Sequence, residues 1–176
     1  MEVKENEILW AKVKENAIIP TKIDENAGYD IYACFDEDYL IINPHETKMI
    51  PSGIACALNK KYYLQLEERG STGSKGIKRS AGVVDSGYRG EIFVALTNTN
   101  IKPIIISKIN DKNTFNQILC KDYPVFNDYI LYPYSKAICQ GIVHEVFNLE
   151  NKEITYEELL KYKSNRGINK LGSSNK

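Results

Sequence analysis

The sequence lacks the signals that would point to nucleic acid, to a membrane or to secretion. Its 23 basic and 23 acidic residues leave no net charge, so no overall field attracts nucleic acid or an anionic membrane surface. No apolar run reaches the roughly 18 residues of a membrane span, and the first residues, MEVKENEILWAKVKEN, are too charged for a signal peptide. We therefore expect a cytoplasmic protein with no nucleic-acid or membrane partner.

The cysteines also lack a recognisable arrangement. Cys34, Cys56, Cys120 and Cys139 are widely spaced and include no CxxC pair, which indicates neither a disulfide framework nor a zinc site. A free cysteine packs as a small apolar residue. We interpret all four as reduced thiols that are mostly buried.

What the sequence does contain is a series of short apolar or alternating runs separated by Gly, Pro, Asn and Asp. Runs such as YDIYACF, KMIPSGIACAL, EIFVALTN and KAICQGIVHEVF have the length and residue types of strands. The 12 tyrosines suit half-buried pleated surfaces. The length of 176 residues favours one compact domain. We predict an all-β sandwich or barrel.

Two parts of the chain depart from the strand pattern. In TYEELLKY, Thr155 precedes Glu158 by three residues, the spacing of a capping box, which predicts one short helix near the C-terminus. Between Asn98 and Gln140 the chain has no clean period, and we interpret residues 103–131 as an insertion. It could be an extra hairpin or a solvated loop, because polar loops tolerate insertion.

The stretch AGVVDSGYRGEIFVALTN, residues 81–98, predicts a β-hairpin. Val83 and Val84 lead into the turn residues DSGY, where Gly87 can take a positive φ, and a second strand follows. The bend carries an acid, Asp85, and an aromatic, Tyr88. An aspartate in a turn often only satisfies nearby backbone N–H groups, so this stretch alone leaves its role open.

Two Gly- and Ser-rich stretches have the composition of anion-binding loops. They are ERGSTGSKG at 68–76 and RGINKLGSS at 166–174, each with an arginine beside free backbone N–H groups. Neither fits the P-loop pattern. A plain loop is the alternative for each of them.

Five segments in order resemble the motifs of the trimeric dUTP diphosphatase (dUTPase) family. They are AGYDIYA (27–33), ERGSTGSKG (68–76), AGVVDSGYRGEI (81–92), KAICQGIV (136–143) and RGINKLGSS (166–174). Motifs one and three are the most specific. The resemblance implies a distorted jelly-roll β-barrel of antiparallel strands with one short C-terminal helix, assembled as a homotrimer. Residues 1–163 would form the domain, and 164–176 would form a flexible arm that closes the active site.

The resemblance also implies the reaction, which is hydrolysis of dUTP to dUMP and pyrophosphate at the α-phosphorus. This keeps uracil out of DNA and supplies dUMP for thymidylate synthesis. Asp85 would activate the attacking water, and Gln140 would position that water or an α-phosphate oxygen. The implied substrate-binding residues are Arg69, Gly70, Ser71, Thr72, Gly82, Val84, Tyr88, Arg166, Leu171, Gly172, Ser173 and Ser174.

Within that set the resemblance implies distinct tasks. The backbone of the motif-three loop would read uracil and exclude the methyl group of thymine, with Tyr88 under the deoxyribose. Mg²⁺ bridging the phosphates is the implied cofactor, and Asp30 would support it through a water molecule. The alternative for Asp30 is that it satisfies local backbone donors.

Three features depart from the family pattern. Gly70 separates Arg69 from Ser71, where the family has Arg-Ser, so Ser71 is our substitute for the motif-two hydroxyl. Lys170 and Leu171 stand where the family has a Phe that stacks on uracil. Leu171 could cover the base, or Phe147 or Tyr162 could do so. The 103–131 insertion resembles that of phage-type dUTPases, in which such a segment can meet a regulatory protein partner.

Two rivals stay open at this stage. A dCTP deaminase shares the fold and a similar loop, but its base is a Glu ten residues beyond the loop Asp, and this chain has Ala95 there. The other rival is a catalytically silent module that binds a nucleotide or a regulator. Asp85 and Gln140 argue against a silent module, and the missing Phe argues for it.

Overall fold

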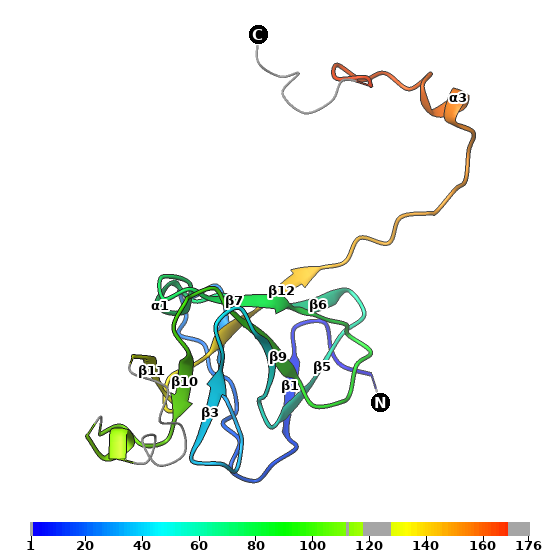
Figure 1. The fold of residues 1–176 in the computed structure, drawn as a ribbon. Coiled ribbons are helices and arrows are strands. Elements are labelled where there is room, and N and C mark those ends of the chain that lie inside the picture. The colour runs from blue at the N-terminus through cyan, green and yellow to red at the C-terminus, as the bar shows by residue number, and fades with distance from the viewer. Residues whose placement is uncertain (1, 112, 118–127, 169–176) are drawn as a thin grey trace. The chain divides into compact units, whose positions relative to one another are not determined.

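The computed structural model describes residues 2–111, 113–117 and 128–168. The chain divides into two units, residues 1–146 and residues 147–176. The first unit holds every strand of the described residues, and the second holds the helix α3 (Figure 1). Within the described part, no helix is long and apolar enough to cross a membrane.

The described residues of the first unit form twelve strands and the short helix α1. The strands are β1 (Ile8–Lys12), β2 (Tyr29–Ile31), β3 (Tyr39–Ile42), β4 (Thr47–Pro51), β5 (Ile54–Leu58), β6 (Tyr62–Glu67), β7 (Ile77–Ala81), β8 (Val83–Val84), β9 (Phe93–Asn98), β10 (Ile104–Ser107), β11 (Ile130–Pro133) and β12 (Cys139–Glu145). Helix α1 spans Gly70–Gly73. The predicted all-β class is confirmed.

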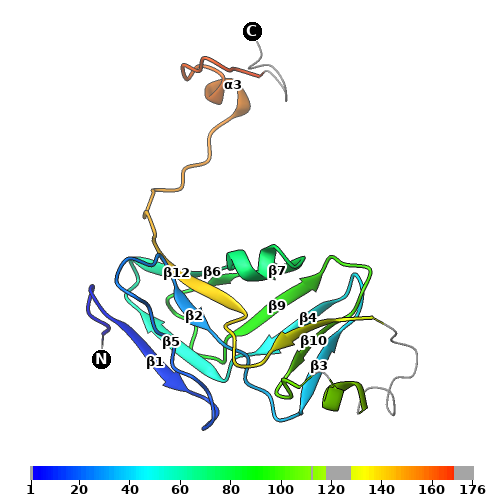
Figure 2. The same cartoon turned by 90° about the vertical axis from the view of Figure 1, so that its left-hand side faces the viewer.

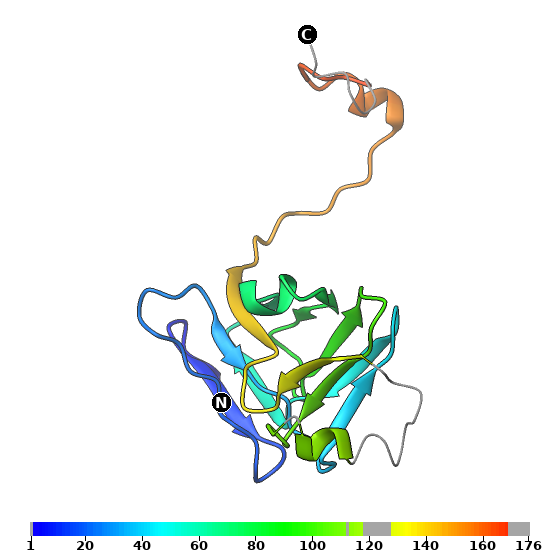
Figure 3. The ribbon, with the colours of Figure 1, turned by 60° about the vertical axis from the view of Figure 1, so that its left-hand side comes forward.

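The strands pair into four small sheets, in the orders β2-β12-β6-β8, β4-β9-β7, β11-β10-β3 and β1-β5. Figure 2 shows β12 and β2 side by side, and the same pair is visible in Figure 3. All pairs are antiparallel except β10 with β11. Neighbouring strands come from distant parts of the sequence, so the pairing brings residues of different motifs together.

The core follows from alternation along the strands. In β6, Leu64 and Leu66 are buried while the residues between them are partly exposed, as expected when successive side chains point to opposite faces. One continuous cluster gathers such residues from most of the strands. Cys34, Cys56 and Cys139 are free and buried, as predicted, and Cys120 lies outside the described residues.

The segment that we interpreted as an insertion, residues 103–131, begins with strand β10 and ends in strand β11, and both strands belong to a sheet of the folded domain. All four residues of β10 are buried, and β10 pairs with β3 on one side and with β11 on the other. Because β10 and β11 are parallel, the chain must cross over between them, which takes a dozen or more residues. Much of the long separation is therefore required by the strand pairing, and the excursion is limited to the 108–129 connection.

The described part of this connection is docked. Residues 113–117 are helical, and Phe115 is fully buried in a second apolar cluster with Ile105. The Phe115 ring contacts Tyr39 and Tyr129, with centroids 5.3 and 5.6 Å apart. Ile105 faces this cluster while its neighbours Ile104 and Ile106 face the main core. Phe115 thus packs on the face of the β11-β10-β3 sheet that carries Ile105.

The second unit contains the predicted helix. Helix α3 spans Tyr156–Leu159, and Thr155 is its N-cap. The Glu158 N–H donates to the Thr155 hydroxyl at 3.2 Å, and the Thr155 N–H donates to the Glu158 carboxylate at 3.0 Å. This is the capping box that the sequence predicts. The expected arm, residues 164–176, falls within this unit, and its role stays a prediction.

Candidate active site

The motif-three loop is wider than a simple hairpin. Strand β8 pairs with β6, where Val84 lies opposite Leu64, whereas β9 pairs with β7, where Ala81 lies opposite Ala95. The paired arms are therefore β7 and β9, and residues 82–92 form the loop between them. The predicted pairing of Val83–Val84 with the outgoing strand is wrong because the chain changes sheets at residue 82.

Glycine at position 82 makes this change of sheet possible. The Leu66 N–H donates to the Gly82 carbonyl at 2.7 Å. A Cβ atom at Gly82 would lie 2.7 Å from the Leu66 carbonyl oxygen and 2.6 Å from Arg79 Cδ. By contrast, Gly87 is not among the positive-φ glycines of the described residues, which are Gly53, Gly76 and Gly167.

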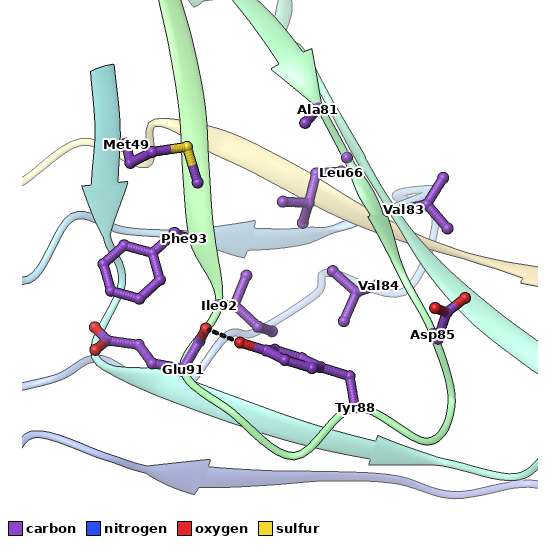
Figure 4. Close-up of a pocket in the computed structure, with 11 residues that line it drawn as sticks. Met49, Leu66, Ala81, Val83, Val84, Asp85, Tyr88, Glu91, Ile92 and Phe93 are labelled. Carbon is purple, nitrogen blue, oxygen red and sulfur yellow. Dashed lines mark hydrogen bonds between the residues drawn. The ribbon is translucent and has the colours of Figure 1, made fainter. Parts of the chain in front are cut away.

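The loop borders a cleft of about 300 Å³, which we call the loop cleft. Figure 4 shows the Tyr88 ring between Asp85 and Glu91, with Val84 and Ile92 beside it. The Tyr88 hydroxyl donates to the Glu91 carbonyl at 2.9 Å. The complete lining is Met49, Leu66, Ala81, Gly82, Val83, Val84, Asp85, Tyr88, Glu91, Ile92 and Phe93.

The far side of the loop is tied to the turn between β4 and β5. The Gly53 N–H donates to Glu91 Oε1 at 2.8 Å, and the Ser52 hydroxyl donates to the Ile92 carbonyl at 2.5 Å. Gly53 has a φ of +66°, a conformation that glycine adopts without strain. These contacts fix the residues that follow Tyr88, so both sides of the loop cleft are held.

A second cleft, of about 360 Å³, lies where β2, β12 and the start of α1 meet; we call it the phosphate cleft. Asp30 of β2 pairs with Gln140 of β12, which pairs in turn with Glu67 of β6. Three motifs that are distant in sequence therefore meet through strand pairing. The lining residues are Asn26, Ala27, Gly28, Asp30, Arg69, Gly70, Ser71 and Gln140.

Arg69 is the cation of the phosphate cleft. Its Nε lies 3.0 Å from Asp30 Oδ1, and its Nη2 donates to Asp30 Oδ2 at 3.3 Å. The two side chains remain about one-third exposed, at 30% and 33%, so a ligand can reach them. A guanidinium with this fork geometry suits phosphate oxygens, and Asp30 orients it.

Gln140 is held by its own contacts. Its Nε2 donates to the Glu68 carbonyl at 3.1 Å. A Cβ atom at Gly28 would lie 3.2 Å from Gln140 Oε1, so glycine leaves room for that oxygen. The preceding residue, Cys139, points into the core, and burial raises the pKa of its thiol to about 12. Cys139 is therefore a packing residue, and Gln140 presents the polar group.

The structure places most predicted residues in one of the two clefts. Asp85, Tyr88, Gly82 and Val84 line the loop cleft, and Asp30, Arg69, Gly70, Ser71 and Gln140 line the phosphate cleft. The two linings share no residue. Thr72 lines neither of them. It is buried, and its hydroxyl accepts from the Arg69 N–H and donates to the Arg69 carbonyl, so it supports the loop instead.

The predicted motif-five residues belong to the second unit. The Arg166 N–H donates to the Ser164 hydroxyl at 3.2 Å. Leu171, Gly172, Ser173 and Ser174 lie outside the described residues. Their assignment stays a prediction.

Sequence reasoning missed several residues that border the clefts. Met49 and Phe93 line the loop cleft from β4 and β9, and Glu91 lines it from within motif three. Of these three residues, Glu91 alone carried a sequence signal, since it lies in the quoted motif. Ala95, the position of the deaminase glutamate, is buried in β9, so the described structure has no acid at that point.

The phosphate cleft offers one carboxylate side chain, that of Asp30, to a magnesium ion. The described residues contain no group of three or more His, Cys, Asp or Glu side chains that could hold a metal. Mg²⁺ usually binds through one or two carboxylates together with substrate phosphates and water. Asp30 is the carboxylate that lines this cleft, so it fits that pattern as the single protein contribution.

The family model and the relatives in sequence that match this chain are dUTPases. The model of the dUTPase family matches residues 14–130. The deoxyuridine 5′-triphosphate nucleotidohydrolase of Leptospira interrogans is 34% identical over 83 residues, which are 46% of this chain and 57% of that protein. The chain thus spans about half the length of the curated relatives it matches.

Solved structures share the fold. The dUTPase of Staphylococcus bacteriophage 80alpha with dUPNHPP is 21% identical, with a TM-score of 0.71 over 96% of this chain and 98% of that one. A mutant dUTPase from phage phi11 of Staphylococcus aureus, described with a structural Mg(II) ion, is 19% identical, with a TM-score of 0.62 over 85% of this chain and 97% of that one. At such identities the likeness concerns the jelly-roll fold.

Proposed function

The chain belongs to the dUTPase family, and from that premise we propose that it hydrolyses dUTP to dUMP and pyrophosphate. The observation that carries the proposal is the loop cleft, in which Asp85 and Tyr88 lie beside the main chain of residues 82–84. A carboxylate next to a slot lined by backbone combines the two features that the reaction needs. The family match covers motifs one to three, and motif four supports it through Gln140.

In the proposed complex, uracil enters the loop cleft and the deoxyribose lies on Tyr88. Gly82, which lines this cleft, lets the main chain approach β6 closely. The Tyr88 hydroxyl is held by the Glu91 carbonyl, which keeps the ring in one orientation. A fixed ring is suited to exclude a ribose 2′-hydroxyl.

The chemical step requires a base, an in-line water and charge stabilisation on the phosphates. Asp85 takes a proton from the water as it attacks the α-phosphorus, and pyrophosphate leaves. Gln140 positions the water or an α-phosphate oxygen, and Arg69 and Ser71 bind the phosphate chain. Mg²⁺ would neutralise part of the phosphate charge, bound mainly through substrate oxygens and water, with Asp30 as the protein carboxylate.

The separation of the two clefts supports a shared site in a homotrimer. One chain presents the acid and the base-reading loop in one cleft and the phosphate-binding groups in another. In the proposed assembly the loop cleft of one subunit meets the phosphate cleft of a neighbour, and the arm of a third subunit, residues 164–176, closes over both. Arg166, Ser173 and Ser174 would then face the γ-phosphate, and Leu171 would cover the base.

Location and regulation complete the proposal. A cytoplasmic location is proposed from membership of the dUTPase family. A regulatory protein partner on residues 103–131 stays a prediction.

The test is a direct assay with a choice of nucleotides. The purified protein is mixed with Mg²⁺ and either dUTP, dCTP, dTTP or UTP, and both pyrophosphate and ammonia are measured. We expect pyrophosphate from dUTP alone and no ammonia. Ammonia from dCTP would instead support a deaminase, and no product from any nucleotide would support a silent binding module.

A further inference from the structure

Tyr132 is a buried tyrosine of β11 that no sequence motif singled out. Its side chain is about 1% exposed, and its hydroxyl donates to the Ala137 carbonyl at 2.7 Å. The same carbonyl accepts a hydrogen bond from Arg69 Nη1 at 3.3 Å. The phenol and the cation of the phosphate cleft are therefore held by one shared acceptor.

Tyr132 also contacts the loop that follows Arg69. The nearby side chains of Ser71 and Arg69 act to lower the pKa of the phenol, and Lys75 Nζ lies 5.4 Å from the centre of its ring. Thr72 and Tyr132 border the same small gap in the interior. Tyr132 therefore lies beneath the segment 69–75, in which Thr72 is buried while Ser71 and Lys75 are exposed.

The Tyr132 hydroxyl is suited to act as a permanent hydrogen-bond donor. Burial raises the pKa of Tyr132 above its ordinary value, although the nearby side chains of Arg69 and Ser71 oppose this rise. The hydroxyl therefore stays protonated at neutral pH. It can donate to the Ala137 carbonyl throughout the range in which a dUTPase would work.

We propose that Tyr132 is a positioning residue that sets Arg69 for binding of the phosphate chain. Arg69 is drawn toward Asp30 on one side, and the carbonyl that Tyr132 holds fixes it on another. Without the phenol, the Ala137 carbonyl loses one of the two donors that hold it, and the Arg69 guanidinium gains freedom that a ligand must remove. This inference rests on the proposed function, because it concerns the phosphate cleft of the same site.

The test is the Tyr132→Phe variant, which keeps the ring and removes only the hydroxyl. Tyr134→Phe is the matched control, since Tyr134 lies two residues away and its hydroxyl interacts with Cys34 and the Phe35 backbone. Binding of inorganic pyrophosphate and of a non-hydrolysable dUTP analogue is measured by calorimetry, together with binding of deoxyuridine. Kinetic constants for dUTP and the thermal midpoint of unfolding complete the set.

We expect Tyr132→Phe to weaken pyrophosphate and the dUTP analogue about tenfold, the effect of losing one positioned hydrogen bond to a charged network. Deoxyuridine binding should stay within about twofold, and Tyr134→Phe should leave all three ligands unchanged. A double-mutant cycle with Arg69→Ala should be non-additive, because Tyr132 acts through the carbonyl that it shares with Arg69.

The outcomes separate this inference from the proposed function. Equal pyrophosphate affinity in wild type and Tyr132→Phe, or an equal loss for deoxyuridine and pyrophosphate, overturns the positioning role. An additive double-mutant cycle also overturns it. Absence of dUTP turnover in the wild type would refute the proposed function, while the pyrophosphate measurements would still decide the role of Tyr132.

Discussion

At the scale of the residue, Asp85 shows how a turn and a functional group can coincide. The Tyr88 N–H donates to the Asp85 carbonyl at 3.0 Å, which closes the turn through the backbone alone. The carboxylate is not needed for that hydrogen bond, and it lines the loop cleft instead. The turn therefore explains the backbone path at this position, whereas the exposed acid requires a functional reason.

The first prediction concerns this carboxylate. Asp85→Asn keeps the size of the side chain but removes the base, so turnover should fall at least about a thousandfold, within the range that general bases contribute. Binding of the dUTP analogue should change little, because the amide fills the same space. Steady-state pyrophosphate release and calorimetry measure the two quantities. Turnover within tenfold of wild type would show that another group activates the water.

The second prediction compares two glycines of the same loop. In Gly82→Ala the new methyl group would collide with the Leu66 carbonyl and Arg79, so we expect a loss of about 1–3 kcal/mol in the free energy of unfolding and weaker dUTP binding. In Gly87→Ala the methyl group would meet no atom within 4 Å, so stability should change by less than about 0.5 kcal/mol. Urea denaturation compares them. Equal effects would contradict the close approach at Gly82.

At the scale of the element, the sequence predicted what is local and missed what is not. The capping box at Thr155 and Glu158 was readable because its residues are three apart. The parallel pairing of β10 with β11 was not, because alternation within a run of isoleucines does not reveal which strand lies beside it. The same limit explains the loop of residues 82–92, since Val83–Val84 pair with β6 and not with the next strand.

The third prediction tests whether the 108–129 connection is docked. Phe115→Ala should cost about 3 kcal/mol of local packing, at the low end for a buried phenylalanine. Amide exchange of residues 108–117 should become faster, while dUTP turnover should stay within a few-fold because Phe115 lines neither cleft. Ile101→Ala is the control, since that side chain is 83% exposed. Unchanged exchange in Phe115→Ala would mean that the connection is a solvated loop.

At the scale of the whole molecule, the residues assigned to one reaction line two clefts that share no residue. The sequence motifs contain residues of both clefts, so sequence reasoning could identify these residues. It could not show from composition or periodicity that Asp85 and Asp30 would line different clefts. This depends on the strand order β2-β12-β6-β8, which puts the strand before Asp85 and the strand that holds Asp30 at opposite edges of one sheet. A shared site in a symmetric assembly resolves the separation.

The last prediction uses this separation directly. Arg69→Ala and Asp85→Asn chains should each form inactive trimers, but trimers that contain both chains should recover activity, because a neighbour supplies the intact cleft. With random mixing of equal amounts, about a quarter of sites would combine an intact loop cleft with an intact phosphate cleft. Co-expression, followed by mass spectrometry of the mixed trimers and a pyrophosphate assay, measures the recovery. Asp85→Asn co-expressed with the Asp85→Asn, Arg69→Ala double variant is the control, since neither chain offers the acid. Mixed trimers as inactive as their parents would place both clefts of a working site in one chain.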